Sequence, residues 1–497
     1  MTIDSPPAIT VTFFVYLALM LAIGLWAFRR TQDSSGYFLG GRRLGPWPAA
    51  LSAGASDMSG WLLLGLPGFA FTSGLESLWL AGGLLAGTWL NWLMVAKRLR
   101  TYSFLANDSL TIPEYFANRF GDRGHLLQVA SAFFVLLFFL FYTSSGLVAG
   151  GKLFETVFGL DYGLAVVIGA LFVVSYTLFG GFLAVSWTDL VQGLLMAAAL
   201  LLVPIIAVQS GGGLGALLAT IEQKNVELLT LGRGVDGEPL TLIAIVSLAA
   251  WGLGYFGQPH ILARFAGIRD KTDVPLARRI AVSWSALTMG GAVLVGLAGI
   301  AYVDNQLGGQ LADAETIFMV LVDALFHPVV AGILLAAILA AIMSTADSQL
   351  LVSSSALAED LYRQLLRPKA SQREIVAIGR GAVVLLAVIA LLLAFDPDST
   401  VLGLVGYAWA GFGAAFGPVL VLSLYWPRMN WNGALAGVLA GGTTVVAWKP
   451  LEGGLFDLYE IVPGVVLGVI SILVVSLATA PPRAAIREGF ERVRAEL

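Results

Sequence analysis

The chain has 497 residues, of which 58% are hydrophobic and only 12% are charged. Soluble domains carry about 25% charged residues, so this composition excludes an ordinary soluble protein and predicts a polytopic membrane protein. The sequence contains no cysteine, which excludes disulfide bonds and thiol chemistry, and its net charge of −4 gives no reason to expect a nucleic-acid partner.

The apolar segments have the length of membrane-spanning helices. A spanning helix needs about 20 apolar residues, whereas the strands of a membrane barrel are short and alternate in polarity. We therefore predict an all-α fold with about 13 transmembrane helices in one domain over residues 1–480, followed by a cytoplasmic tail over 481–497. In chain order, the segments cover roughly 9–28, 46–73, 76–97, 126–155, 161–180, 186–208, 240–266, 278–304, 327–360, 374–395, 400–426, 433–449 and 460–479.

Two shorter regions carry separate expectations. Residues 314–326 are expected to form a short external helix at the surface, and the charged tail is expected to fray or to lie on the membrane.

The basic residues predict the orientation of the chain, because cytoplasmic loops are rich in Lys and Arg. Most of them fall in alternate loops on one side, among them Arg29, Arg30, Arg42, Arg264, Arg269, Arg367 and Lys369. The loops of the opposite side carry Lys152, Lys224, Arg233 and Lys449. We predict the N-terminus outside and the C-terminus inside.

The second segment, 46–73, has a polar interruption at its centre, where Asp57 lies between Ser56 and Ser59 and close to Gly60. An aspartate near the bilayer centre costs roughly 2.5–3.5 kcal/mol on insertion scales, so it usually faces a protein interior and marks an ion or substrate path. The alternative is that Asp57 lies at an interface and caps a helix.

The seventh segment, 240–266, has a comparable interruption between Trp251 and His260, with three glycines and Pro259. Proline removes a helical hydrogen bond, so we expect this segment to unwind. Each interrupted segment begins a group of five spans, which predicts two inverted repeats, at 46–208 and 240–426, with binding near the breaks. The alternative is that the glycines only permit close helix packing.

A third polar island lies inside the ninth segment and comprises Ser344, Thr345, Asp347, Ser348 and Gln349. Hydroxyls together with carbonyls released by an unwound helix suit a hard monovalent cation such as Na⁺. The alternative is that the hydroxyls bond back to their own helix.

Three strings, 52–61, 252–265 and 403–410, resemble the sodium/solute symporter family, and the resemblance extends from about Gly40 to about Ala480. Within the family, they are most similar to bacterial carriers of proline. The resemblance implies a fold of the leucine-transporter type with a 5+5 inverted repeat. The first helix, 9–28, and the last two, within 433–479, would be peripheral.

The resemblance also implies roles for those residues of this chain that match binding residues of the family. The resemblance implies a sodium site formed by the carbonyls of Ala55, Met58 and Ala341 and the hydroxyls of Ser344 and Thr345. It implies that Asp57 and Arg42 serve coupling, and that the solute meets Ser59, Gly60, Tyr142, Trp251, Tyr255, Gln258 and Pro259. The alternatives are ordinary packing for the aromatic residues, above all Tyr142, and a purely topological role for Arg42.

A second sodium site is a further hypothesis. Ser344, Asp347 and Ser348 share one helical face, and Asp189 begins the sixth span near the cytoplasm. In some relatives, an aspartate at that place helps to hold a second sodium ion. The alternative is that Asp347 stabilises the inner end of the ninth span.

Together, these features imply sodium-coupled secondary active symport of L-proline into the cell by alternating access, in a bacterial inner membrane. The expected partners are proline, Na⁺ as the co-transported ion and the lipid bilayer, with no organic cofactor and no obligatory protein partner. No catalytic motif is evident, so we do not expect an enzyme. The alternatives are a symporter of pantothenate, another amino acid or an osmoprotectant, or a transporter-like sensor.

Overall fold

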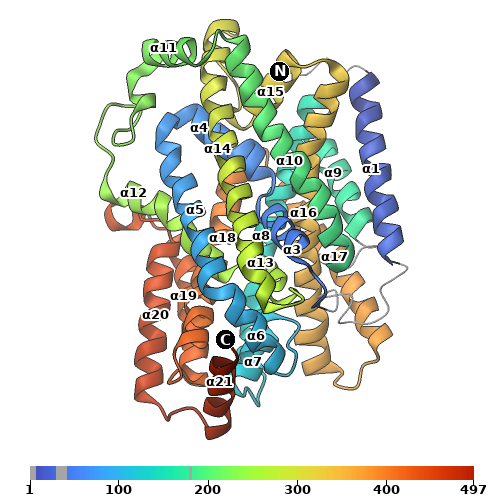
Figure 1. Cartoon of the computed structure of the whole chain (residues 1–497), viewed down its shortest axis with the longest axis vertical. Coiled ribbons are helices and arrows are strands. Elements are labelled where there is room, and N and C mark those ends of the chain that lie inside the picture. The colour runs from blue at the N-terminus through green and yellow to red at the C-terminus, as the bar shows by residue number, and fades with distance from the viewer. Residues whose placement is uncertain (1–6, 29–41, 178–181) are drawn as a thin grey trace.

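The computed structural model describes residues 7–28, 42–177 and 182–497, so Arg29 and Arg30 lie outside the described residues. Within these ranges the chain is helical, and the only β-pairing is two isolated bridges. The α-helices, labelled in Figure 1, are α1 (Pro7–Phe28), α3 (Pro46–Asp57), α4 (Leu66–Ser73), α5 (Ser77–Asn91), α6 (Lys97–Leu105), α7 (Ile112–Phe120), α8 (Leu126–Phe158), α9 (Tyr162–Thr177), α10 (Phe182–Ser210), α11 (Leu214–Asn225), α12 (Leu242–Ala249), α13 (Pro259–Ala266), α14 (Val274–Gln306), α15 (Ile317–Leu325), α16 (Pro328–Ser355), α17 (Gln372–Ala394), α18 (Val401–Tyr425), α19 (Trp431–Trp448), α20 (Ile461–Ala478) and α21 (Ala484–Glu496). Short segments used below are the π-helix η2 (Trp61–Gly65) and the 3₁₀ helices η6 (Ala250–Gly257) and η8 (Ala314–Thr316).

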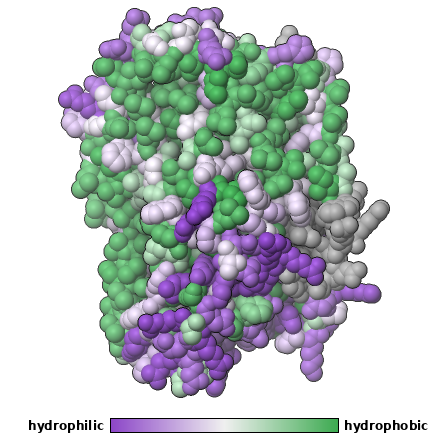
Figure 2. Space-filling view, in the orientation of Figure 1, coloured by the Kyte–Doolittle hydropathy of each residue, from purple (hydrophilic) through white to green (hydrophobic). Residues whose placement is uncertain are grey.

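Among the described residues, eight helical segments are long and apolar enough to cross a membrane, or nine if α12, η6 and α13 count as one bent span. Shorter apolar helices cover Pro7–Ile23 and Tyr162–Ser175. Figure 2 shows hydrophobic side chains over most of the visible surface, whereas hydrophilic residues gather toward the end at which α21 lies. The chain is therefore an all-helical membrane protein, and the finer count of thirteen spans stays a prediction.

Helices α16 and α18 form the centre of the molecule. In the most apolar window of each, 83% of the residues are buried, compared with 28% in α20. Figure 1 shows α16 among α3, α8 and α10, whereas α1 and α20 lie at opposite outer edges. The polar island of α16 therefore lies in the protein interior and not at a lipid-facing surface.

The predicted interruption of the second segment is confirmed, because α3 ends at Asp57 and η2 begins only at Trp61. In a continuous helix, the N–H of Ser59 would bond to the carbonyl of Ala55. Instead it donates to the carbonyl of Asp57 at 3.0 Å. The break therefore releases the Ala55 carbonyl for other partners.

The seventh segment is also interrupted, as predicted. Residues 250–257 form a 3₁₀ helix, and Pro259 begins α13 after a bend of 45°. The packing alternative for the glycines holds as well. A Cβ on Gly252 would lie 2.2 Å from the carbonyl oxygen of Gly83, and a Cβ on Gly254 would lie 1.9 Å from Nε1 of Trp409. The glycines thus serve the close approach of α5 and α18, while the proline separates the two halves of the segment.

Two segments expected at the surface are packed against the protein instead. The external segment forms η8 and α15, in which the residues from Ile317 to Val322 are buried. The tail forms α21, where Phe490 is 5% exposed and meets the ring of Tyr102 edge-on at 6.3 Å. The expected helix within 314–326 is thus present but largely buried. The expected fraying of the tail was wrong, because an amphipathic helix gains stability by burying its apolar face, here with Phe490 and Val493 one turn apart.

Candidate ion and solute site

The carbonyl of Ala55 is the point at which α3 meets α16. The Oγ of Ser344 lies 2.8 Å from this oxygen, and the Oγ1 of Thr345 lies 3.4 Å from it. The Oγ of Ser344 also lies 3.1 Å from the carbonyl oxygen of Ala341. The structure therefore brings these predicted sodium ligands together, and Met58, the remaining one, directly follows the end of α3.

The polar groups of this cluster are neutral oxygens, the kind of ligand that suits a monovalent cation without a full carboxylate cage. Ser344 is 0% and Thr345 2% exposed, so an ion among them would be shielded from bulk water. The alternative that the hydroxyls bond only to their own helix is wrong for Ser344. Its shorter contact is with Ala55 on α3, so it joins two helices.

Asp57 links the two broken segments. Its carboxyl oxygen Oδ2 accepts a hydrogen bond from the hydroxyl of Tyr255 at 2.6 Å. Its backbone carbonyl accepts from the hydroxyl of Tyr142 at 3.0 Å and from Nε1 of Trp61 at 3.1 Å. Asp57 is 2% exposed, so the alternative of a helix cap at an interface is wrong.

The predicted solute residues surround the two breaks. All of them are buried: Ser59, Gly60, Tyr142, Trp251, Tyr255, Gln258 and Pro259. The amide Nε2 of Gln258 lies 3.1 Å from the carbonyl of Gly254 and 3.3 Å from that of Trp409. The amide thus braces the unwound segment against α18, and the two tyrosine hydroxyls reach the first break through Asp57.

Two aromatic residues without a predicted role, Trp409 and Tyr459, hold the second break. Nε1 of Trp409 donates to the carbonyl of Trp251 at 2.6 Å, and the ring of Tyr459 stacks on Trp251 with centroids 5.3 Å apart. Trp409 lies inside the string 403–410, which gave a signal. Tyr459 lies in a connection between α19 and α20, and nothing in the local sequence distinguishes it.

Beyond Pro259, toward α6 and α7, the structure has a small cavity. It offers about 20 Å³, enough for about one water molecule. Its lining includes Ser103, Thr111, Tyr115, Pro259 and Ser355. This cavity therefore has no room for a solute much larger than water.

Arg42 connects the approach to α3 with the ends of two other helices. It donates to Asp108 at 2.7 Å, to the hydroxyl of Ser103 at 3.0 Å and to the carbonyl of Ala266, the last residue of α13, at 2.6 Å. Burial lowers the pKa of the Arg42 guanidinium, and the hydrogen bond and charge of Asp108 counter this shift. These bonds give Arg42 a structural task beyond topology, and its role in coupling stays a prediction.

Two of the residues predicted for a second sodium site contact a buried arginine. Asp189 and Ser348 both contact the guanidinium of Arg264, at 3.2 and 2.5 Å, and Asp347 is buried nearby in α16. The pattern of basic residues predicts Arg264 in a cytoplasmic loop. This was wrong, since Arg264 lies in α13 and is fully buried. Its position inside the string 252–265 was the available signal.

Comparison with known proteins now defines the family. The model of the sodium:solute symporter family matches residues 37–441. The chain belongs to this family. It is 51% identical to the sodium/proline symporter of Escherichia coli strain K12 over 493 residues, covering 99% of this chain and 96% of that protein. It is 52% identical to the high-affinity proline transporter PutP of Bacillus subtilis strain 168 over 474 residues, covering 95% and 98%.

Among solved structures, the chain resembles a Na⁺-coupled sialic acid symporter in its substrate-bound outward-open state. The TM-score is 0.79 at 21% sequence identity, and the match covers 96% of this chain and 99% of the other. This likeness shows the fold, which is of the leucine-transporter type. As a member of the sodium:solute symporter family, the chain is a multi-pass membrane transporter and not an enzyme.

Proposed function

We propose that this transporter carries L-proline into the cell together with sodium, across a bacterial inner membrane. The observation that carries the proposal is the cluster at the first break, where Ser344 and Thr345 meet the released carbonyl of Ala55. Full-length relatives about half identical to the chain, named as a sodium/proline symporter and a proline transporter, support the choice of solute.

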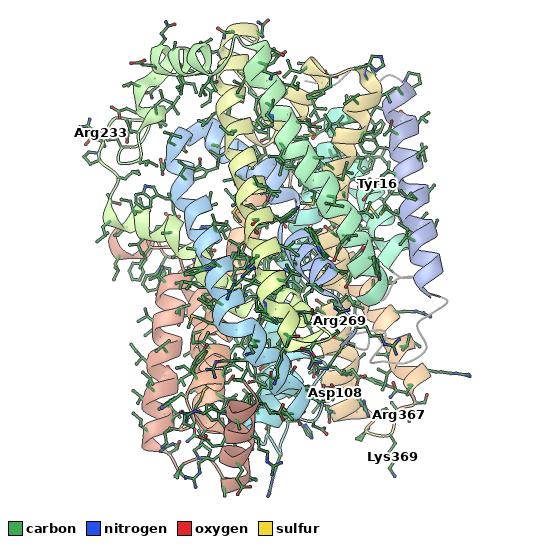
Figure 3. All side chains as sticks on the ribbon, viewed as in Figure 1. Tyr16, Asp108, Arg233, Arg269, Arg367 and Lys369 are labelled. Carbon is green, nitrogen blue, oxygen red and sulfur yellow. The ribbon has the colours of Figure 1, made fainter. Side chains whose placement is uncertain are left out.

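The proposal includes thirteen spans, two inverted five-helix repeats, an external N-terminus and a cytoplasmic C-terminus. The distribution of basic residues supports this orientation. Figure 3 places Arg269, Arg367 and Lys369 toward the end of the molecule at which α21 lies, and Arg233 toward the opposite end. Since cytoplasmic loops are the basic ones, the end with α21 is the cytoplasmic side.

The sodium ion is held by the carbonyls of Ala55, Met58 and Ala341 and the hydroxyls of Ser344 and Thr345. A hydroxyl that now donates to a carbonyl can turn its proton away and present a lone pair to the ion. The ion thereby replaces direct bonds between α3 and α16 and holds the two helices together through its own charge.

Proline binds where the two breaks face each other. Backbone amide groups at the first break, near Gly60, can receive its carboxylate. The rings of Tyr142, Trp251 and Tyr255 suit the pyrrolidine ring and its cationic nitrogen. Sodium binds first from outside and fixes the first break, and Asp57 passes this ordering to Tyr255 through their 2.6 Å hydrogen bond. Rocking of a four-helix bundle (spans 2, 3, 7 and 8) against the other helices then opens the inner side.

One sodium ion per proline is energetically sufficient. A tenfold gradient supplies about 1.4 kcal/mol, and a membrane potential on the order of 150 mV adds about 3.5 kcal/mol. At about 1.4 kcal/mol per factor of ten, this permits accumulation of roughly several thousandfold.

The test is uptake of labelled L-proline into proteoliposomes with an inward sodium gradient, compared with potassium or choline. We expect accumulation only with sodium, loss of accumulation in Asp57→Asn, and wild-type uptake in Ser175→Ala, which alters a hydroxyl bonded only within α9. Sodium-driven uptake of another solute in place of proline would retain the symporter and overturn the substrate. Binding without accumulation would favour a sensor.

A further inference from the structure

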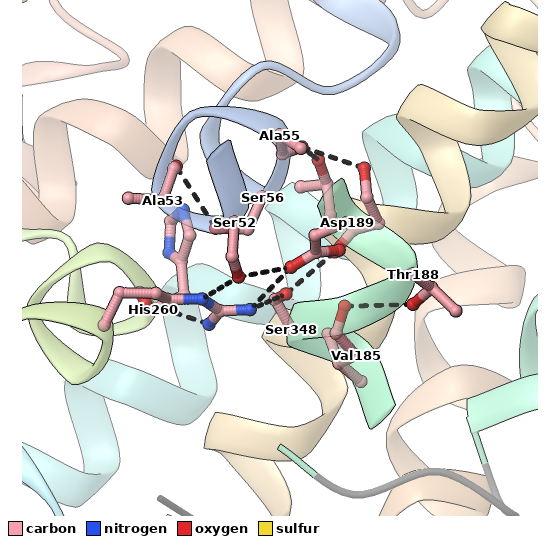
Figure 4. Close-up of polar contacts among 12 residues, drawn as sticks. Ser52, Ala53, Ala55, Ser56, Val185, Thr188, Asp189, His260 and Ser348 are labelled. Carbon is pink, nitrogen blue, oxygen red and sulfur yellow. Dashed lines mark hydrogen bonds and ion pairs between the residues drawn. The ribbon is translucent and has the colours of Figure 1, made fainter. Parts of the chain in front are cut away.

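Arg264 is a buried cation to which the proposed transport cycle assigns no task. Its side chain is 0% exposed. Its Nε donates to the hydroxyl of Ser52 at 3.0 Å, and its Nη1 donates to the carbonyl of His260 at 3.0 Å. Its Nη2 lies 2.5 Å from the hydroxyl of Ser348 and 3.2 Å from Oδ2 of Asp189 (Figure 4).

The cluster around Arg264 connects helices of the proposed rocking bundle with helices outside it. Arg264 lies in α13 and Ser52 in α3, the two half-helices that flank the breaks. Asp189 lies in α10 and Ser348 in α16, outside the group proposed to rock. The hydroxyl of Ser52 also donates to Oδ2 of Asp189 at 2.6 Å. The cluster therefore links the helices proposed to rock to the remaining helices through charged side chains.

Stability alone does not explain this ion pair. A buried pair recovers little net free energy, because removing two charges from water offsets much of their attraction. The second carboxyl oxygen of Asp189, Oδ1, is buried and makes no hydrogen bond within the described part of the chain. Charged groups inside a membrane are rare and usually mark an ion path.

The cluster lies one helical turn from the proposed sodium ligands on both helices. Ser348 follows Ser344 by four residues in α16 and donates to its carbonyl at 2.8 Å. Ser52 precedes Ala55 by three residues in α3. Since a helix rises 1.5 Å per residue, the two serines that bind the guanidinium are displaced from the Ala55–Ser344 contact by about 4.5 Å along α3 and about 6 Å along α16.

We propose that Arg264 is a resident cation that takes the place of the second sodium ion predicted at Asp189, Asp347 and Ser348. The proposal rests on the proposed sodium coupling. The guanidinium lies 3.2 Å from Asp189 and supplies it with the positive charge that an ion would otherwise provide, and Asp347 is buried beside Ser348 in α16. Arg264 is thus a positioning residue, because it holds the helices that carry the sodium ligands and leaves one exchangeable ion.

The replacement of Arg264 by a small neutral residue tests this directly. In Arg264→Ser, Asp189 remains with the hydroxyls of Ser52 and Ser348 and the carbonyl of His260, a set of oxygens that can receive a cation. The measurement is equilibrium binding of radioactive sodium to the purified full-length protein in detergent, without solute. At saturating sodium we expect about one bound ion per protein in the wild type and about two in Arg264→Ser.

Two further variants separate this role from a merely structural one. The double variant Arg264→Ser/Asp189→Asn removes the carboxylate and should return to one bound ion. Arg264→Lys retains a cation and should also bind one. A wild-type count of two, or a folded Arg264→Ser that binds one, overturns the proposal.

Thermal unfolding shows which variants are folded. If Arg264→Ser does not fold, the wild type and Arg264→Lys decide the question. One bound sodium ion in each of these two proteins supports the proposal, and two bound ions in either of them overturn it. The sodium counts are measured without solute, so they are independent of the proposed substrate. If the expected counts are found but the protein does not accumulate proline, the proposed substrate is overturned and Arg264 remains the resident cation.

Discussion

The two broken helices interrupt their hydrogen bonding by different means. The first break spans only the residues between Asp57 and Trp61 and contains no proline, and it leaves the carbonyl of Ala55 to the hydroxyls of α16. The second break extends over the 3₁₀ helix η6 and ends at Pro259, and aromatic rings surround it. One break therefore presents neutral oxygens and the other presents ring faces.

This difference assigns the two ligands to different breaks. Neutral oxygens at a short break suit a small cation, whereas a longer segment lined by rings suits a solute with an apolar ring. The two breaks meet at one hydrogen bond, from the hydroxyl of Tyr255 to Asp57. Variants should therefore fall into three classes, affecting both ligands, the ion alone or the solute alone.

The largest effect is expected where the breaks meet. Tyr255→Phe removes the 2.6 Å bond and leaves both carboxyl oxygens of Asp57 without a hydrogen bond among the described residues. An unsatisfied buried group costs about 1–3 kcal/mol, so the half-saturating concentrations of sodium and of proline should both rise by about 5- to 150-fold.

Uptake titrations with each ligand at saturating levels of the other measure this effect. Tyr162→Phe, which removes a hydroxyl bonded to the carbonyl of Ala394 in another region, serves as the matched control. If Tyr255→Phe changes only one of the two half-saturations, the two breaks are not coupled through Asp57.

Much of this arrangement was predictable from the sequence because polar residues and helix breakers stand out in apolar segments. Asp57, the glycines before Pro259 and the hydroxyls near Ser344 marked the breaks and the island of α16 in this way. The resemblance to the family then supplied individual ligands such as Ala55, whose side chain carries no signal because only its carbonyl is used.

The remaining features depend on contacts between distant segments. Arg264 looked like a loop residue because it lies near the end of an apolar segment, and only the fold brings it to Asp189, 75 positions away in sequence. Tyr459 reaches Trp251 from a loop of ordinary composition. The docking of α21 was not predicted, because the sequence of a charged helix does not reveal which surface of the protein buries its apolar face.

The second class of variant should affect the ion alone. Ser344→Ala removes the hydroxyl that lies 2.8 Å from the Ala55 carbonyl, and with it one proposed ligand of sodium. A loss of about 1.4 kcal/mol raises the half-saturating sodium concentration by about tenfold. The half-saturating proline concentration at saturating sodium should stay unchanged.

Ser354→Ala is the matched control for this variant, because its hydroxyl bonds to the carbonyl of Leu351 within the same helix α16. It should leave both titrations as in the wild type. An unchanged sodium titration in Ser344→Ala would remove this hydroxyl from the ion site.

The smallest effect should affect the solute alone. Trp409→Phe keeps an aromatic ring near Tyr255, whose ring now lies edge-on at 4.9 Å, but removes the 2.6 Å bond to the carbonyl of Trp251. A typical hydrogen bond contributes about 0.5–1.5 kcal/mol, so the half-saturating proline concentration should rise by about 2- to 10-fold while the sodium titration stays unchanged.

Trp79→Phe gives the matched comparison, since Trp79 donates the same kind of bond, at 2.8 Å, to the carbonyl of Leu231 in the connection before α12. It should leave proline uptake unaffected. A shift of the sodium titration in Trp409→Phe would mean that α18 supports the ion as well as the solute. In that case the second break could not be assigned to the solute alone, because its brace against α18 would also determine how firmly the first break is held.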